Sequence, residues 1–199
     1  MMLIEKTAVP DAALPVDAFR AHLRLGSDFT TQAVEDDLLQ SFLRAALAAV
    51  EARTGRMLLV RDFSWSLTRW RDPAAQALPV APVAAVARVA LVARDGTETE
   101  VAPERYWLER DAQRPVLRAV GAALPQVPPG GSVQIDLEAG QAVAWTDLPA
   151  DLRQAVLMLA AHYYEYREDT GLSAGCMPFG VSSLIERYRT VRMGLGLAR

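Results

Sequence analysis

The side chains that most often carry out catalysis are few in this sequence, and they lie far apart. The 199 residues include two histidines, His22 and His162, and one cysteine, Cys176. Neither histidine belongs to a metal-binding spacing such as HExxH, and a single cysteine forms neither an intrachain disulfide nor a multi-cysteine zinc site. A Cys176–His162 nucleophile pair would depend on geometry that the sequence does not specify. We interpret both histidines as helix residues beside apolar neighbours and Cys176 as a loop thiol.

Two pairs of adjacent acids could bind a divalent ion or flank a glycosidic bond. Asp36-Asp37 lies in the first turn of a predicted helix, where the helix dipole favours negative charge, whereas Glu168-Asp169 lies at the end of one. Solvation at the surface accounts for both pairs, and no GxSxG, Walker A or GxGxxG motif is present. We therefore predict no catalytic residue, cofactor or metal. The alternative is a small metal-dependent or cysteine hydrolase.

Aromatic and basic side chains gather at one point in the sequence, which contains Tyr163, Tyr164, Tyr166 and Arg167. Consecutive tyrosines on one helix cannot all face one core, so we expect at least one at the surface. Tyrosine and arginine are enriched among the residues that dominate binding energy at protein interfaces. The group is therefore either a candidate protein interface or a wide core contact whose hydroxyls are in water.

A second candidate interface lies near the C-terminus and consists of Arg187, Tyr188, Arg189 and Arg192. Such arginines could contact DNA phosphates, complement the dipole at the end of the last helix, or dock on an acidic protein surface. The chain has 21 basic and 24 acidic residues and a formal net charge of −3. This slightly acidic balance favours a protein partner over DNA.

Helices that could position these groups are predicted at both ends of the sequence. Apolar residues at helical spacing indicate a short helix that begins at about Val16 and ends near Gly26. A longer apolar stripe begins at Val34, and Gly55 is well placed as the C′ residue that ends this helix. A third helix, over 149–169, is apolar nearly all round, which is typical of a helix central to a core or shared with a neighbouring subunit. Apolar residues from Leu184 to Val191 predict a final helix.

The middle of the sequence has the alternating pattern of β-strands. Apolar and polar residues alternate over 62–67 and again over 133–138, as in half-buried strands. Asp95-Gly96 is typical of a tight hairpin turn between strands over 83–91 and 98–101. Further short strands are predicted over 106–108 and 116–117.

These elements predict an α+β fold, in which long antiparallel helices from the N- and C-terminal zones form a helical body with an inserted small antiparallel β-sheet or sandwich. The predicted boundaries are 1–56 and 148–199 for the body and 57–147 for the insertion, within a single domain. The first ten residues lack the apolar run of a signal peptide, and the longest apolar stretch, 155–161, is too short to cross a bilayer. We expect a protein made and kept in a reducing cytoplasm, with no membrane partner.

Four segments recur in the same order in one protein family. They are Ala21-His22-Leu23-Arg24-Leu25 with Glu35-Asp36-Asp37-Leu38-Leu39; Val50-Glu51-Ala52-Arg53-Thr54-Gly55-Arg56; Leu148 to Val156 leading to His162-Tyr163-Tyr164-Glu165; and Pro178-Phe179-Gly180-Val181 with Leu184 and Tyr188-Arg189. In this order they resemble the head–tail connector (adaptor) family of tailed phages, whose relatives occur in prophages and gene transfer agents. The Trp145-Thr146-Asp147 segment and the Gly-Leu tail have no counterpart in that pattern.

The resemblance implies a structural subunit of a virion neck without catalytic residues. Members of the family form rings, commonly of twelve copies, under the portal protein at one capsid vertex. Such a ring extends the channel through which DNA passes and carries the next neck, stopper or tail protein. We expect the final helix and the arginine-containing tail to dock on the portal. Another neck component, such as a stopper or a tail terminator, is the alternative within the structural class.

Overall fold

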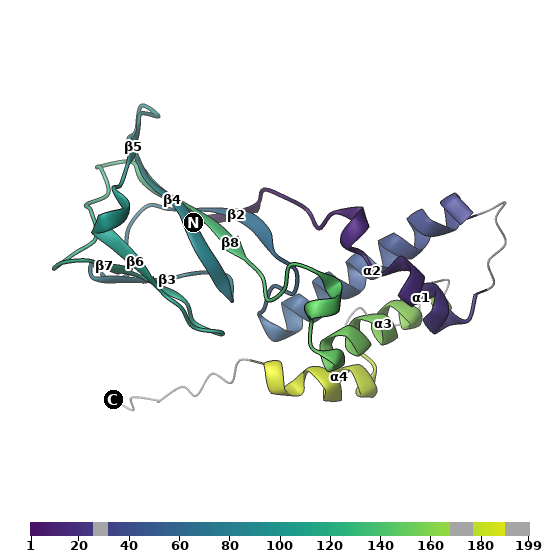
Figure 1. Cartoon of the computed structure of the whole chain (residues 1–199). Coiled ribbons are helices and arrows are strands. Elements are labelled where there is room, and N and C mark those ends of the chain that lie inside the picture. Colours follow the sequence, from purple (N-terminus) through teal and green to yellow (C-terminus); the bar gives the residue numbers. More distant parts are fainter. Residues whose placement is uncertain (26–31, 168–176, 190–199) are drawn as a thin grey trace. The chain divides into compact units, whose positions relative to one another are not determined.

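The computed structural model describes residues 1–25, 32–167 and 177–189, and these residues form two compact units (Figure 1). The first, the β unit, comprises Met1–Leu14 and Arg56–Leu148. The second, the helical unit, comprises Pro15–Gly55 and Pro149–Arg199. Four α-helices and two antiparallel sheets in the described residues confirm the predicted α+β class.

The helical unit is built around one central helix. Its helices are α1 (Val16–Leu23), α2 (Gln32–Thr54), α3 (Ala150–Glu165) and α4 (Phe179–Ile185), and a 3-10 turn, η4 (Glu186–Tyr188), follows α4. Helix α3 contacts each of the other three helices. The described core of this unit consists of Phe19, Leu39, Leu43, Ala46, Leu47, Val50, Leu152, Ala155, Val156, Leu159, Ala160, Val181 and Ile185.

The ends of the first two helices show how local sequence sets their lengths. Gly55 follows α2 with φ of 71°, and its amide donates a hydrogen bond to the Glu51 carbonyl, as predicted for a C′ glycine. The prediction that the first helix ends near Gly26 was wrong. It ends at Leu23, because Arg24 adopts the left-handed conformation (φ 57°) and donates its amide proton to the Ala21 carbonyl.

The final helix also differs from its prediction. The helix was expected over Leu184 to Val191, but α4 begins at Phe179, directly after Pro178. A Cβ at Gly180 would lie 2.9 Å from the Met158 Cε atom of α3, so a larger residue here would require only the flexible end of the Met158 side chain to move. The α-helix ends at Ile185, and the chain continues as the η4 turn before it becomes extended at Arg189.

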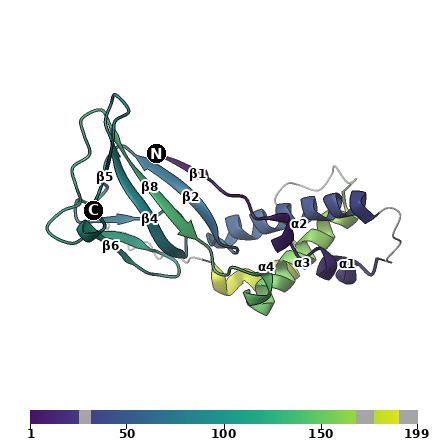
Figure 2. The ribbon, with the colours of Figure 1, turned by 45° about the horizontal axis from the view of Figure 1, so that its top comes forward.

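The β unit contains two antiparallel sheets (Figure 2). The five-stranded sheet has the order β1 (Met2–Glu5), β2 (Arg61–Leu67), β8 (Ser132–Ala139), β4 (Val83–Val92), β5 (Glu98–Glu100). The three-stranded sheet has the order β3 (Ala75–Ala77), β7 (Val116–Ala119), β6 (Tyr106–Glu109). Short 3-10 turns lie at η1 (Asp11–Ala13), η2 (Pro103–Arg105) and η3 (Trp145–Asp147).

Alternation of apolar side chains places the core of the β unit between its sheets. Phe63, Trp65 and Leu67 of β2 are buried, and they pair across the sheet with Leu137, Ile135 and Val133 of β8. Leu117 of the three-stranded sheet belongs to the same buried cluster. The strands predicted over 62–67 and 133–138 are thus confirmed, each with one face in this core.

Two of the glycines with positive φ in the β unit, Gly96 and Gly140, adopt it for different reasons. Gly96 (φ 86°) lies in the β4–β5 turn, where the Thr97 amide donates a hydrogen bond to Asp95 Oδ1, which confirms the predicted hairpin. Gly140 (φ 153°) follows β8, and a Cβ there would lie 2.4 Å from the Val60 Cα. Only glycine permits this close approach of two backbone segments.

Candidate protein-interface surfaces

Some of the described residues that could do chemistry have structural partners within the helical unit. Among the described residues, no group of three or more His, Cys, Asp or Glu side chains could hold a metal ion. Asp36 forms an ion pair with Arg20, which links α1 to α2. His22 is exposed on α1, and His162 lies on α3 with its ring centroid 4.8 Å from that of Tyr166. Cys176 and Glu168-Asp169 lie outside the described residues.

The first candidate interface, at the C-terminal end of α3, is partly packed within the helical unit. The Tyr164 ring makes an edge-to-face contact with Phe42 of α2, with ring centroids 5.9 Å apart. The Arg167 guanidinium lies 4.8 Å from the Tyr164 ring centroid, and Arg167 Nη1 donates a hydrogen bond to the Tyr164 carbonyl at 3.1 Å. Tyr164 therefore joins α2 to α3 and also positions Arg167.

The remaining tyrosines of this group differ in exposure. Tyr163 is half-buried, and this burial raises the pKa of its hydroxyl. Tyr166 is 48% exposed, and its ring packs against His162. Tyr166 and Arg167 thus form an exposed aromatic and basic pair at the end of α3, which we call the α3-end pair.

The second candidate interface is mostly engaged inside the helical unit. The Tyr188 side chain is buried, and its hydroxyl donates a hydrogen bond to Asp151 Oδ1 at 2.8 Å. Arg187 Nη2 lies 2.6 Å from Asp151 Oδ2 and 2.5 Å from the Tyr188 hydroxyl oxygen. Arg189 forms an exposed ion pair with Glu186 at 3.0 Å. Arg192 lies outside the described residues.

This Asp151–Arg187–Tyr188 network joins the η4 turn to the first turn of α3. Nothing in the local sequence of Asp151 indicates a partner at Tyr188, 37 residues away. Sequence reasoning also missed the exposure of Phe179, whose side chain is 88% exposed although it begins α4. The apolar periodicity of 181–185 could have shown this, because Phe179 does not share the face of Val181 and Ile185.

We expect Tyr188→Phe to lower the free energy of unfolding of the helical unit by about 1 kcal/mol at neutral pH, because Asp151 loses one buried hydrogen bond. Burial, together with the hydrogen bond to Asp151, raises the pKa of Tyr188 above its ordinary value of about 10. The contribution of this group to stability is therefore complete below about pH 10 and is lost as the pH rises through the higher folded pKa.

The test is denaturant unfolding of both proteins between neutral pH and strongly alkaline pH. Tyr188→Phe is expected to lose less stability above about pH 10 than the unsubstituted chain does. Arg189→Gln serves as the control, since an exposed ion pair contributes only about 0–1 kcal/mol. If the free energy of unfolding falls equally steeply above about pH 10 in Tyr188→Phe and in the original chain, the assigned role of the Tyr188 hydroxyl is contradicted.

Chains in solved gene transfer agent (GTA) particles are similar to this one over nearly their whole length. One, from the neck of an empty GTA particle computed with C6 symmetry, has 53% sequence identity and a TM-score of 0.88, and the match covers 98% of this chain and 99% of that one. Another, from the neck of a native GTA particle computed with C12 symmetry, has 50% identity and a TM-score of 0.84 at the same coverage. The chain belongs to the family of gene transfer agent neck proteins.

A third similar chain, from the virion of a native GTA particle, has 52% identity and a TM-score of 0.85, and again 98% of this chain and 99% of that chain are covered. No protein-family model and no curated protein matches the sequence. Among the described residues, no helix of this neck protein is both long and apolar enough to cross a membrane. Family membership agrees with the location in a virion neck that the sequence predicted.

Proposed function

We propose that this GTA neck protein is the adaptor subunit, which forms a ring under the portal, extends the DNA channel and carries the next neck or tail protein. The observation that carries the proposal is full-length similarity, at 50–53% identity, to chains in GTA necks computed with C6 and C12 symmetry. A ring of twelve copies is compatible with both symmetries. The role is structural, and we assign no catalytic residue.

The described surface of the helical unit supports a ring-forming role. Copies in a closed ring contact each other through two different surfaces, so each copy needs exposed anchors that its own core does not use. Tyr166 and Phe179 are large side chains exposed on this unit, and the exposed Arg167 lies against the Tyr164 ring. Aromatic residues and arginine are enriched at such interfaces.

The adaptor is favoured over a stopper or a tail terminator because of the helical unit. Stoppers and terminators are often predominantly β, whereas all four family segments lie chiefly in helices of this chain: α1 with α2, the end of α2, α3, and α4. The net charge of −3 also suits a channel through which DNA passes without binding. DNA is therefore a passing cargo of the ring and no stable ligand.

The experiment that tests this proposal is the solution mass of the purified chain, alone and mixed with the portal protein of the same particle. We expect either a ring of the chain alone or a collar that joins the portal in fixed stoichiometry. A monomer that does not bind the portal at micromolar concentration would contradict the proposal.

Within the segment that follows α4, portal docking is assigned to residues 190–199. We expect removal of residues 190–199, which contain two arginines, to lower the affinity for the portal at least tenfold, because interface arginines of this kind contribute about 1–2 kcal/mol or more. Arg189→Ala is the control, since Arg189 already pairs with Glu186. Portal binding measured by co-sedimentation that is undiminished in the truncated chain would contradict this assignment.

A further inference from the structure

The first strand of the β unit is exposed along its whole length, although most of its residues are apolar. Met2, Leu3 and Ile4 are 58%, 41% and 47% exposed, and β1 is an end strand of the five-stranded sheet (Figure 2). Leu3 pairs with Trp65, on the core face, whereas Met2 and Ile4 pair with Ser66 and Ser64 on the opposite face. The core therefore accounts for little of this apolar surface.

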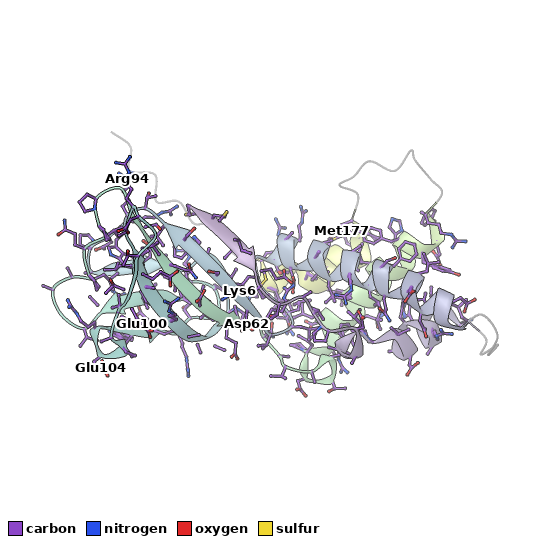
Figure 3. All side chains as sticks on the ribbon, turned by 90° about the horizontal axis from the view of Figure 1, so that it is seen from above. Lys6, Asp62, Arg94, Glu100, Glu104 and Met177 are labelled. Atoms are coloured by element: carbon purple, nitrogen blue, oxygen red, sulfur yellow. The ribbon has the colours of Figure 1, made fainter. Side chains whose placement is uncertain are left out.

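An edge strand of this kind is a template for pairing with another strand. Proteins usually protect such edges with charged residues, proline or a bulge, and 2–4 contains none of these. The charges that follow are satisfied within the unit: Glu5 pairs with Arg61 at 3.1 Å and Lys6 with Asp136 at 3.6 Å. Figure 3 shows Lys6 close to Asp62, whose carbonyl accepts a hydrogen bond from the Lys6 amide.

The opposite side of the same sheet is also incompletely paired. Strand β4 extends over Val83–Val92, but β5 pairs only with Ala90 to Val92, and the Val101 amide bonds to the Val89 carbonyl. Among the described residues, no strand pairs with 83–88 on that side. Three of these six residues, at 84, 85 and 87, are alanines, and Arg88 forms an ion pair with Glu98 at 2.6 Å. One backbone group, the Ala84 carbonyl, accepts a hydrogen bond from Arg110 Nη2.

The directions of the two edges are complementary. Each neighbouring pair in the order β1-β2-β8-β4 is antiparallel, so β4 runs opposite to β1. Rotation about a ring axis that lies close to the strand direction preserves the direction of every strand. Strand β1 of one copy would then meet β4 of the next copy in antiparallel orientation, which is the orientation that extends an antiparallel sheet.

We propose that β1 of each copy adds to residues 83–88 of β4 in the neighbouring copy, so that the five-stranded sheets join around the ring. This inference rests on the proposed ring function, and the occupant of the β1 edge is a second copy of the same chain. Main-chain hydrogen bonds hold the pair together, and the large side chains of Met2, Leu3 and Ile4 cover the alanines of β4. A pair of unlike edges is the head-to-tail contact that closes a ring.

The test is disulfide cross-linking in the collar that the full chain forms with the portal. Ile4→Cys and Ala85→Cys place thiols on the same face of the joined sheet, because Ile4 pairs with Ser64 and Ala85 with Glu138 on the face opposite the core. Both are introduced with Cys176→Ser. Met2→Cys with Ala85→Cys covers a shift of two residues in register. Ile4→Cys with Ala77→Cys, an exposed alanine of β3, is the matched control.

Oxidation is expected to convert one of the two test pairs into a ladder of covalent oligomers up to the ring size, while the control pair and each single-cysteine variant remain monomeric under denaturing conditions. Monomers from both test pairs in an intact collar would overturn the inference and leave the proposed function standing. If the original chain forms neither a ring nor a collar, the proposed function fails and the inference fails with it.

Discussion

Trp65→Ala is expected to lower the free energy of unfolding of the β unit by about 3–5 kcal/mol, the range for removal of a large aromatic side chain from a core. Trp65 is 2% exposed and lies in the middle of β2, where Leu3 of β1 and Ile135 of β8 are its cross-strand partners. The loss combines the transfer of apolar surface to water with the cavity that remains between the sheets. Denaturant unfolding followed by circular dichroism measures it.

Trp65→Phe is the matched control for this prediction. The indole Nε1 of Trp65 is buried without a hydrogen-bond partner among the described residues, so its removal relieves a polar group that burial disfavours. We expect a loss of about 1–2 kcal/mol for Trp65→Phe, because an aromatic ring still fills most of the site. Equal losses for the two substitutions would show that the packing of the ring does not determine the stability of this core.

Replacement of the α3-end pair by alanine, Tyr166→Ala with Arg167→Ala, is expected to weaken assembly of the chain into the neck at least tenfold. Tyr166 is 48% exposed, and Arg167 is exposed and held beside Tyr164. The helical unit gains little from either side chain, whereas a central aromatic or arginine anchor contributes about 2 kcal/mol or more to an interface. Concentration-dependent assembly with the portal, measured by analytical ultracentrifugation, gives the change.

Gln154→Ala, at an exposed position of the same helix, is the control for the α3-end pair. The Gln154→Ala variant is expected to assemble like the original chain and to unfold at the same denaturant concentration. If the double variant keeps its stability and also assembles normally, the interface assignment of this pair is wrong.

The elements with strong periodicity were the ones predicted well from the sequence. Helix α2 has a continuous apolar stripe and a C′ glycine at Gly55, and β2 and β8 alternate over most of their lengths. Each of these patterns follows from burial of one face, so the sequence specifies the element and its orientation together. The Asp95-Gly96 turn was predicted for the same kind of reason, because it depends only on neighbouring residues.

The strands that were missed lack this local information. Strand β1 is Met-Leu-Ile-Glu, a sequence without apolar–polar alternation, and all four of its residues are exposed. Strand β3 is Ala-Gln-Ala, which has low strand propensity. Its central residue, Gln76, is buried, and its side chain accepts a hydrogen bond from the Arg71 amide and donates one to the Ala77 carbonyl. Pairing with β2 and β7 determines these strands, and such contacts are distant in sequence.

The candidate interfaces show the same division between local and distant information. The clustering of tyrosine and arginine at the end of α3 was visible in the sequence, and Tyr166 and Arg167 are exposed there. Tyr188 had the same residue type and the same expected role, but it bonds to Asp151 inside the helical unit. Residue type indicates which side chains are able to anchor a partner, while their own tertiary contacts determine which of them are free to do so.

A density map of the intact particle neck tests the adaptor assignment most directly. We expect twelve copies of this chain in the layer that contacts the portal, with the tail of each copy on the portal surface. Placement of the chain in a lower layer of the neck, without contact to the portal, would contradict the adaptor assignment and identify another neck component.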